Sequence, residues 1–193
     1  MSTGADNGRA SDIKKARQLI AGLYDADMGR RFASARALGE FAGAHPDLIK
    51  KVWNRVFYAF DDTMSCWGVA EGLGEVARNV AGMRIKILRL LRKFEDDEAS
   101  CQGFIWAVCR IGQVDREIIS GFVQDLIDRL SSPTPCMLGQ AIWALGELGI
   151  SQSAETIRGM TDDMRETWIY ENEGVVRMTI GEIAKQALGK LSA

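Results

Sequence analysis

Apolar side chains recur along most of the chain at intervals of three and four residues, the spacing of one face of an α-helix. The pattern starts after residues 1–10, which are small and polar and are predicted to form a flexible tail. It continues without a linker or a low-complexity segment, so residues 11–193 are predicted to form a single domain. Polar turns and helix-capping residues divide this domain into ten predicted helices, arranged as five hairpins.

Two of the predicted helices lie near the C-terminus. The last one is expected from about Asn172 to Leu191. Runs of alternating polar and apolar residues are scarce, so no β-rich architecture is expected and the predicted fold class is all-α. The helix before the last one is predicted from apolar residues spaced by 3, 4 and 4 positions, namely Ile157, Met160, Met164 and Trp168.

One short motif recurs in the predicted helices. A repeat of about 20–50 residues is typical of helical hairpins that stack, here predicted as a right-handed α-solenoid. Between the small fourth residues of successive copies the spacings are 31, 39, 37 and 35 residues. The copies are Arg36-Ala-Leu-Gly-Glu40, Trp67-Gly-Val-Ala-Glu71, Trp106-Ala-Val-Cys-Arg110, Trp143-Ala-Leu-Gly-Glu147 and Met178-Thr-Ile-Gly-Glu182.

The motif helices resemble those of the HEAT-like repeat family, as found in phycocyanobilin lyase subunits. That family carries a pattern close to Val-Arg-x-x-Ala-x-x-Ala-Leu-Gly-x-Ile-Gly, matched best by the stretches from Arg31 to Ala42 and from Gln140 to Gly149. The resemblance covers about residues 11–191 and implies a superhelix of stacked hairpins. It gives no separate indication of a bilin-lyase activity, because fold does not imply function.

The motif also places a set of residues on one face of successive helices. A residue two positions before the packed Leu or Val lies about 160° away around the helix, and the residue four positions later returns to that face. In the HEAT-like family this face lines the concave side, so we expect a groove with a ladder of indoles and charged groups. The predicted binding residues are Arg36, Trp67, Glu71, Trp106, Arg110, Trp143, Glu147 and Met178.

Three interpretations of the ladder are open at this level. Tryptophan is mostly buried in proteins, so the indoles are consistent with structural packing between repeats. Exposed Trp with Arg is a usual hot-spot composition, which predicts a non-catalytic scaffold that binds a protein or peptide partner in the groove. The third is a site for a nucleobase or a small cationic ligand, since indole faces near Glu71 and Glu147 suit a positive group.

An enzymatic alternative follows from the same resemblance. Some bacterial alkylpurine DNA glycosylases are built from HEAT-like repeats and hold a damaged nucleotide with Trp residues, an acidic residue and an Arg. Similar residue types occur here at Trp67, Glu71, Arg110 and Trp143, and a carboxylate can stabilise positive charge at the sugar as the base leaves. Glu stands where those enzymes use Asp, and a pI of about 5.6 disfavours binding to DNA phosphates.

Composition narrows the remaining classes. No apolar run approaches the roughly 18–20 residues that span a bilayer, and the basic run from Arg84 to Lys93 is predicted to be a solvated outer face. His45 is the only histidine and the four cysteines lack paired spacing, so no metal or other cofactor is expected. The start of the chain lacks the pattern of a signal peptide, and a cytoplasmic location is expected.

Overall fold

The computed structural model describes residues 3–51, 68–92, 95, 101–171 and 174–192. These residues are mostly helical, with a small two-stranded antiparallel sheet that the all-α prediction did not include. The main elements are α1 (Thr3–Gly22), α2 (Met28–Ala44), α4 (Val69–Asn79), α5 (Arg84–Leu91), α6 (Cys101–Gly112), α7 (Val123–Asp128), α8 (Pro135–Glu147), α9 (Ala154–Arg158), β1 (Glu166–Glu171), β2 (Gly174–Thr179) and α10 (Ile180–Leu191).

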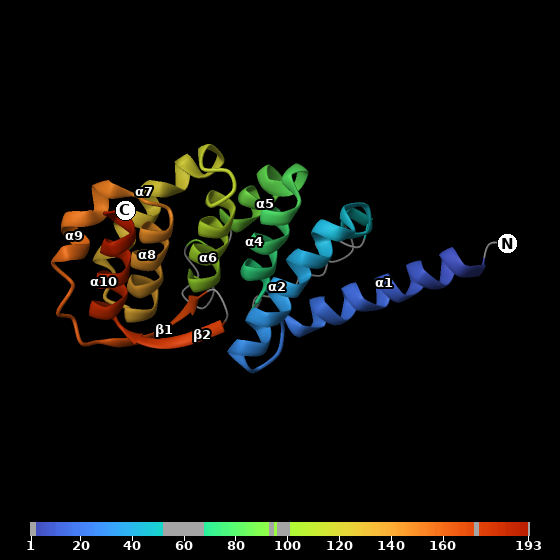
Figure 1. Cartoon of the computed structure of the whole chain (residues 1–193), viewed down its shortest axis with the longest axis horizontal. Coiled ribbons are helices and arrows are strands. Elements are labelled where there is room, and N and C mark those ends of the chain that lie inside the picture. The colour runs from blue at the N-terminus through green and yellow to red at the C-terminus, as the bar shows by residue number, and fades with distance from the viewer. Residues whose placement is uncertain (1–2, 52–67, 93–94, 96–100, 172–173, 193) are drawn as a thin grey trace.

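The helices that carry the repeated motif pack side by side in chain order (Figure 1). Helix α2 lies against α4, α4 against α6, α6 against α8, and α8 against α10. The intervening helices pack on this row, with α5 on α4, α7 on α8 and α9 on α10. Buried side chains from all the motif helices belong to one hydrophobic core, so each hairpin depends on its neighbours to bury its apolar face.

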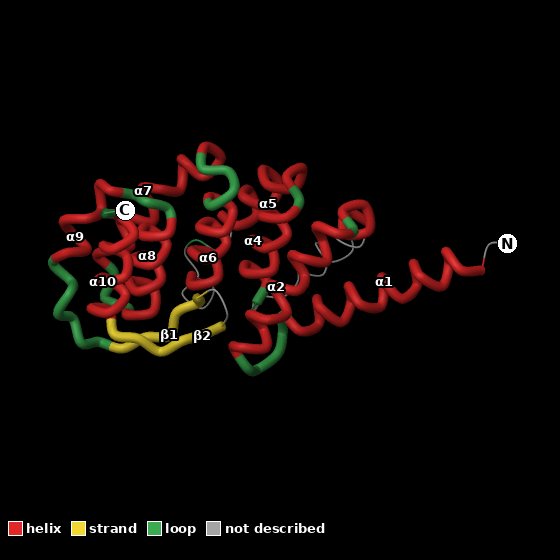
Figure 2. The backbone as a smooth tube through the Cα atoms, viewed as in Figure 1, coloured by secondary structure: helices red, strands yellow, loops and turns green. Residues whose placement is uncertain are grey.

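A β-hairpin precedes the last helix. Strands β1 and β2 pair antiparallel, and Trp168 lies opposite Arg177. Figure 2 shows the two strands, in yellow, crossing one end of the helical row between α10 and α2. Strand β1 contacts α8 and strand β2 contacts α2, so the hairpin links helices that are distant in sequence.

Two helix predictions near the C-terminus are therefore wrong. The helix expected to reach Trp168 ends at Arg158 as α9, and the last helix begins at Ile180 rather than near Asn172. The residues between them include Thr-Trp-Ile-Tyr in β1 and Val-Val in β2, and β-branched and aromatic side chains favour extended structure. A capping box at Thr179 then starts α10, because the threonine hydroxyl accepts a hydrogen bond from the third backbone N–H of the helix.

Helix α1 begins at Thr3, so residues predicted to form a flexible tail make up its first turns. Ala16 and Leu23 are buried, and α1 packs on α2. Its N-terminal part projects beyond the row of helices (Figure 1). Neither α1 nor any other helix in the described part of the chain has the length and apolar character needed to cross a membrane.

Small residues bring the backbones of neighbouring motif helices close together. A Cβ added at Gly74 of α4 would lie 2.4 Å from the Cα atom of Ala107 in α6. One added at Gly146 of α8 would lie 2.7 Å from the Cα atom of Ala187 in α10. We call this set of residues the small-residue column, and its other members are Gly39, which approaches α4, and Cys109, whose Sγ atom is 4.0 Å from a carbonyl oxygen of α8.

The small-residue column corrects the register of two motif copies. In each copy the small residue follows Leu or Val and precedes a charged residue. The second copy is Leu73-Gly74-Glu75, because Gly74 is the residue that approaches the backbone of α6. This copy lies one helical turn after the stretch that ends at Glu71. The fifth is Leu188-Gly189-Lys190 in α10, and the inserted hairpin lengthens its distance from the fourth. From Gly39 onward, the spacings to Gly74, Cys109, Gly146 and Gly189 are 35, 35, 37 and 43 residues.

We expect Gly74→Ala to lower the free energy of unfolding by about 1–3 kcal/mol, because the new methyl group would overlap the backbone of α6. The higher helix propensity of alanine, worth about 1 kcal/mol, acts in the opposite direction. Gly189→Ala is the matched control, since a Cβ there meets nothing within 4 Å. It should leave stability unchanged or raise it. Urea unfolding followed by circular dichroism measures both, and equal effects would contradict the role of close approach.

Candidate functional site

The two described indoles of the predicted ladder are buried. Trp106 in α6 and Trp143 in α8 stack with their ring centroids 5.0 Å apart and an angle of 15° between the ring planes. The expectation that these rings line an accessible groove is therefore wrong, and they pack between neighbouring helices instead. Trp67, the first indole of the ladder, lies outside the described residues.

The β-hairpin occupies the place where the groove was expected. Tyr170 of β1 stacks on Phe32 of α2 with centroids 4.9 Å apart, and it meets Trp106 edge-on at 5.8 Å. Its hydroxyl group donates a hydrogen bond of 2.6 Å to Oε1 of Glu71 in α4. Its backbone N–H donates to the side chain of Gln140 in α8. Contacts with α2, α4, α6 and α8 thus hold Tyr170 beside Trp106.

A buried ion pair joins two neighbouring motif helices at the charged position of the repeat. Nε of Arg110 donates to Oε1 of Glu75 over 2.7 Å, and the two side chains are only 8% and 2% exposed. The indole N–H of Trp106 donates to the same carboxylate oxygen at 3.1 Å. Burying a charge without partners costs several kcal/mol. These contacts offset that cost for the Glu75 carboxylate.

The ion pair continues across the row as a chain of polar side chains. Gln113 accepts hydrogen bonds from Arg110 at 2.9 Å and from Arg78 at 2.6 Å, and it donates to Glu147 at 2.8 Å. Glu147 in turn pairs with Lys190 of α10. We call Glu75, Arg110, Gln113, Glu147 and Lys190 the polar chain. Two predicted binding residues, Arg110 and Glu147, therefore connect helices to one another.

The other predicted binding residues are spread over different elements. Arg36 is half-buried in α2, and Met178 is half-buried in β2. Glu71 is buried in the first turn of α4. In the corrected register, Glu71 occupies the position that Trp106 and Trp143 take in the following motif helices. At this position α4 thus carries a carboxylate where the two following motif helices carry a buried indole.

The arrangement required by the glycosylase alternative is not found in the described part of the chain. That hypothesis places Glu71, Arg110 and Trp143 along one accessible wall. Arg110 instead pairs with Glu75 inside the protein, and Trp143 is buried beneath its neighbours. Glu71 is hydrogen-bonded by Tyr170. These groups therefore do not line a common surface for a nucleotide.

A cavity of about 330 Å³ adjoins Glu71. It lies where the first turns of α2, α4 and α6 meet the hairpin. Glu71 is 3% exposed, and Gly103 makes room for its carboxylate, since a Cβ at Gly103 would lie 2.4 Å from Oε2 of Glu71. We call this space the Glu71 cavity, and its lining residues are Ala26, Met28, Arg31, Glu71, Gln102, Gly103 and Tyr170.

Burial dominates the electrostatics of Glu71. Desolvation raises the pKa of its carboxyl group to about 7. The hydrogen bond from Tyr170, a backbone hydrogen bond and the positive charge of Arg31 offset only part of this effect. Arg31 is held at the turn before α2, where its Nη1 group donates to the carbonyl oxygens of Asp25 at 2.9 Å and Ala26 at 3.1 Å. Burial also raises the pKa of Tyr170, so its hydroxyl group remains a donor.

The basic run on α5 takes part in structural contacts. Arg84 pairs with Asp115 at 3.1 Å, and Arg92 pairs with Asp125 at 2.6 Å. Each of these bonds connects α5 to the segment that follows α6. The run is therefore partly neutralised by its acidic neighbours. Lys93 lies outside the described residues.

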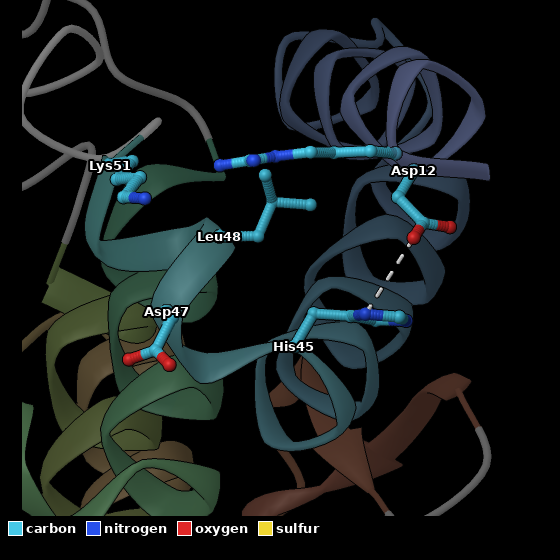
Figure 3. A pocket seen from close by; sticks show the side chains of 6 residues that line it. Asp12, His45, Asp47, Leu48 and Lys51 are labelled. Atoms are coloured by element: carbon cyan, nitrogen blue, oxygen red, sulfur yellow. Dashed lines mark ion pairs between the residues drawn. The ribbon is translucent and has the colours of Figure 1, made fainter. Parts of the chain in front are cut away.

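A second cavity, of about 230 Å³, lies beside the only histidine of the sequence. Figure 3 shows His45 and Asp12 pointing toward one another, with Nδ1 of His45 3.8 Å from Oδ2 of Asp12, while Asp47 points away from them. Both side chains of the pair are more than a third exposed, so the contact contributes little to stability. No cluster of three or more potential metal ligands occurs among the described residues.

Glu71 is the only predicted site residue among the seven that line the Glu71 cavity, and Gln102, Gly103 and Tyr170 are among those that sequence analysis missed. Tyr170 lies between the two helices predicted near the C-terminus, and that prediction gives no reason to expect it close to α4. The neighbouring β-branched and aromatic residues were the available signal for a strand. Gly103 interrupts an otherwise apolar helical run, which indicates a close approach by another group.

No family model matches the chain, and no curated protein matches it. The crystal structure of an engineered protein is similar to this structure, with a TM-score of 0.51 and 16% sequence identity. The similarity covers 100% of this chain and 93% of that chain. At this level of identity, the likeness concerns the fold alone.

We expect Arg110→Met to lower the free energy of unfolding by about 3–5 kcal/mol, because it leaves the buried Glu75 carboxylate without its cation. The double variant Glu75→Gln, Arg110→Met should recover a large part of this loss, since neither member then carries a buried charge. Guanidinium unfolding of the wild type, both single variants and the double variant gives the coupling energy. Strictly additive losses would show that the pair is not coupled.

The contribution of Glu71 to stability should decrease as pH rises from 5 to 8. Its pKa is about 7 in the folded protein against an ordinary value of 4.5, so between these values the folded state binds the proton more tightly. The stabilisation is complete below pH 4.5 and is lost, by about 3 kcal/mol, as pH rises through 7. Unfolding free energies of the wild type and of Glu71→Gln should therefore converge or cross with rising pH. A constant difference would contradict the raised pKa.

Proposed function

We propose that this protein is a non-catalytic scaffold of the HEAT-like class, a right-handed α-solenoid that recognises a protein or peptide partner. Its recognition surface is the exposed face of the β-hairpin around the opposed residues Trp168 and Arg177, which we call the hairpin face. This surface takes the place of the predicted groove lined by Trp residues, because the two described indoles are buried and Tyr170 lies edge-on against Trp106.

The exposure of Trp168 carries the proposal. Trp168 is 49% exposed, and Arg177, directly opposite on β2, is exposed as well. Trp and Arg are among the residues most enriched at the energetic centres of protein interfaces. An exposed indole next to a guanidinium group offers a partner both a large apolar area and a charged hydrogen-bond donor.

The hairpin face is held rigidly, which favours its use in recognition. The Nε2 group of Gln102 donates a hydrogen bond of 2.6 Å to the carbonyl oxygen of Trp168. Two residues further along β1, Tyr170 is fixed by Phe32 and Glu71. A surface that is ordered before binding loses less conformational entropy when the partner binds.

The packing of the motif helices supports the solenoid class. They lie in chain order, each contacts the next, and the small-residue column repeats at their contacts. The activity on alkylated DNA stays a prediction from the family resemblance, since the positions of Arg110 and Trp143 lend it no support.

We expect Trp168→Ala to reduce the amount of partner captured by the immobilised protein at least tenfold, because the substitution deletes the central contact of the hairpin face. Affinity capture from the native cell lysate, with quantitative mass spectrometry, measures the loss. Ile85→Ala is the matched control, since Ile85 on α5 is 59% exposed and lies on another element. Partners retained equally by both variants would place recognition elsewhere.

A further inference from the structure

We propose that the Glu71 cavity binds an alkylammonium group, with the Glu71 carboxylate as the counter-ion and the alkyl chain between Met28 and Tyr170. This site is separate from the hairpin face and does not depend on its function. The ligand chemistry is a protonated primary amine on a short aliphatic chain. Such a group can come from a free amine or from a lysine side chain.

The first argument is the position of Glu71 in the repeat. The equivalent positions in α6 and α8 hold Trp106 and Trp143, which fill space between helices. At α4 this volume is occupied by a carboxylate and a cavity of about 330 Å³. A cavity of this size matches the lower end of the range for small-molecule sites.

The second argument is the incomplete compensation of the carboxylate. Glu71 accepts one short hydrogen bond from Tyr170, and the charge of Arg31 has the smallest effect on it among the stabilising contacts. Burial outweighs all of these together. Glu75, one turn further along α4, is equally buried but receives a close guanidinium group from Arg110. An ammonium ion in the cavity would supply to Glu71 what Arg110 supplies to Glu75.

The third argument is the chemistry of the walls. Met28 is half-buried and presents a flexible apolar side chain, and the ring of Tyr170 lies beside the carboxylate that its hydroxyl group contacts. Gln102 adds a polar amide at the same end of α6. An aliphatic chain can therefore pack on Met28 and the aromatic ring while its ammonium group reaches Glu71.

The test uses the full chain and isothermal titration calorimetry. The probes are n-butylamine, which reproduces a lysine side chain, and Nα-acetyl-lysinamide, each paired with a neutral analogue: n-butanol and the Nε-acetylated lysinamide. The proposal is supported if either amine binds while its neutral analogue does not. Binding of n-butylamine alone assigns a free amine as the source, and binding of the lysinamide alone assigns a lysine side chain. Absence of binding by both amines overturns the proposal.

The variant Glu71→Gln should weaken amine binding at least tenfold, because the amide keeps the shape but removes the charge. The control Glu117→Gln removes an exposed carboxylate from another part of the chain and should leave binding unchanged. Unchanged binding by Glu71→Gln would contradict the site.

A measurement on the wild type covers the case in which Glu71→Gln fails to fold. In the free protein the Glu71 carboxyl group is mostly protonated at pH 6 and mostly ionised at pH 8. Pairing with an ammonium group therefore releases most of a proton per ligand at pH 6 and little at pH 8, with affinity about tenfold lower at pH 6. Titrations in buffers of different ionisation enthalpy give the proton count. Equal proton release at both values would place the amine away from Glu71.

Discussion

The close approach of successive motif helices is the constraint on which the rest of the structure depends. At Gly74 and Gly146 the neighbouring backbone fills the space of a side chain, so the distance and the register between helices are fixed together. Once two helices meet in this way, residues at equivalent positions of the repeat face one another. The indole stack and the polar chain are both consequences, because each joins positions a constant number of residues from the small-residue column.

The polar chain makes this register specific. The glycine contacts set how close the helices come, and a buried charge adds a polar requirement to the same register. Glu75 must meet Arg110, or a charge is left without a partner inside the protein. The pair of Glu147 and Lys190 is partly solvated, with side chains 16% and 42% exposed. The buried ion pair and the glycine contacts therefore favour the same packing, and Gln113 connects Arg110 to Glu147.

Helical periodicity and the repeat were readable from the sequence because both depend on local spacing. The register of the second copy was not, since Trp67 to Glu71 and Glu71 to Glu75 both satisfy a short, degenerate pattern. The partner of Glu75, which decides between them, lies 35 residues away in α6. The hairpin was missed for a related reason: the apolar spacing up to Trp168 fits a helix. The β-branched and aromatic residues that favour a strand there are supported by contacts with distant α2 and α8.

The hairpin also determines where a site can form. Indoles fill the space between α6 and α8, so a cavity at the equivalent position of the stack requires a departure from the repeat. Two departures coincide here: Glu71 replaces an indole, and the hairpin brings Tyr170 to the same point. The ring of Tyr170 packs against Phe32 and Trp106. The first turns of α2, α4 and α6 leave a cavity beside its hydroxyl group and the Glu71 carboxylate. Because burial disfavours the charged form, the Glu71 carboxyl group is stable either as a neutral acid or as the partner of a cation. In both states it lines the cavity, where a ligand can reach it.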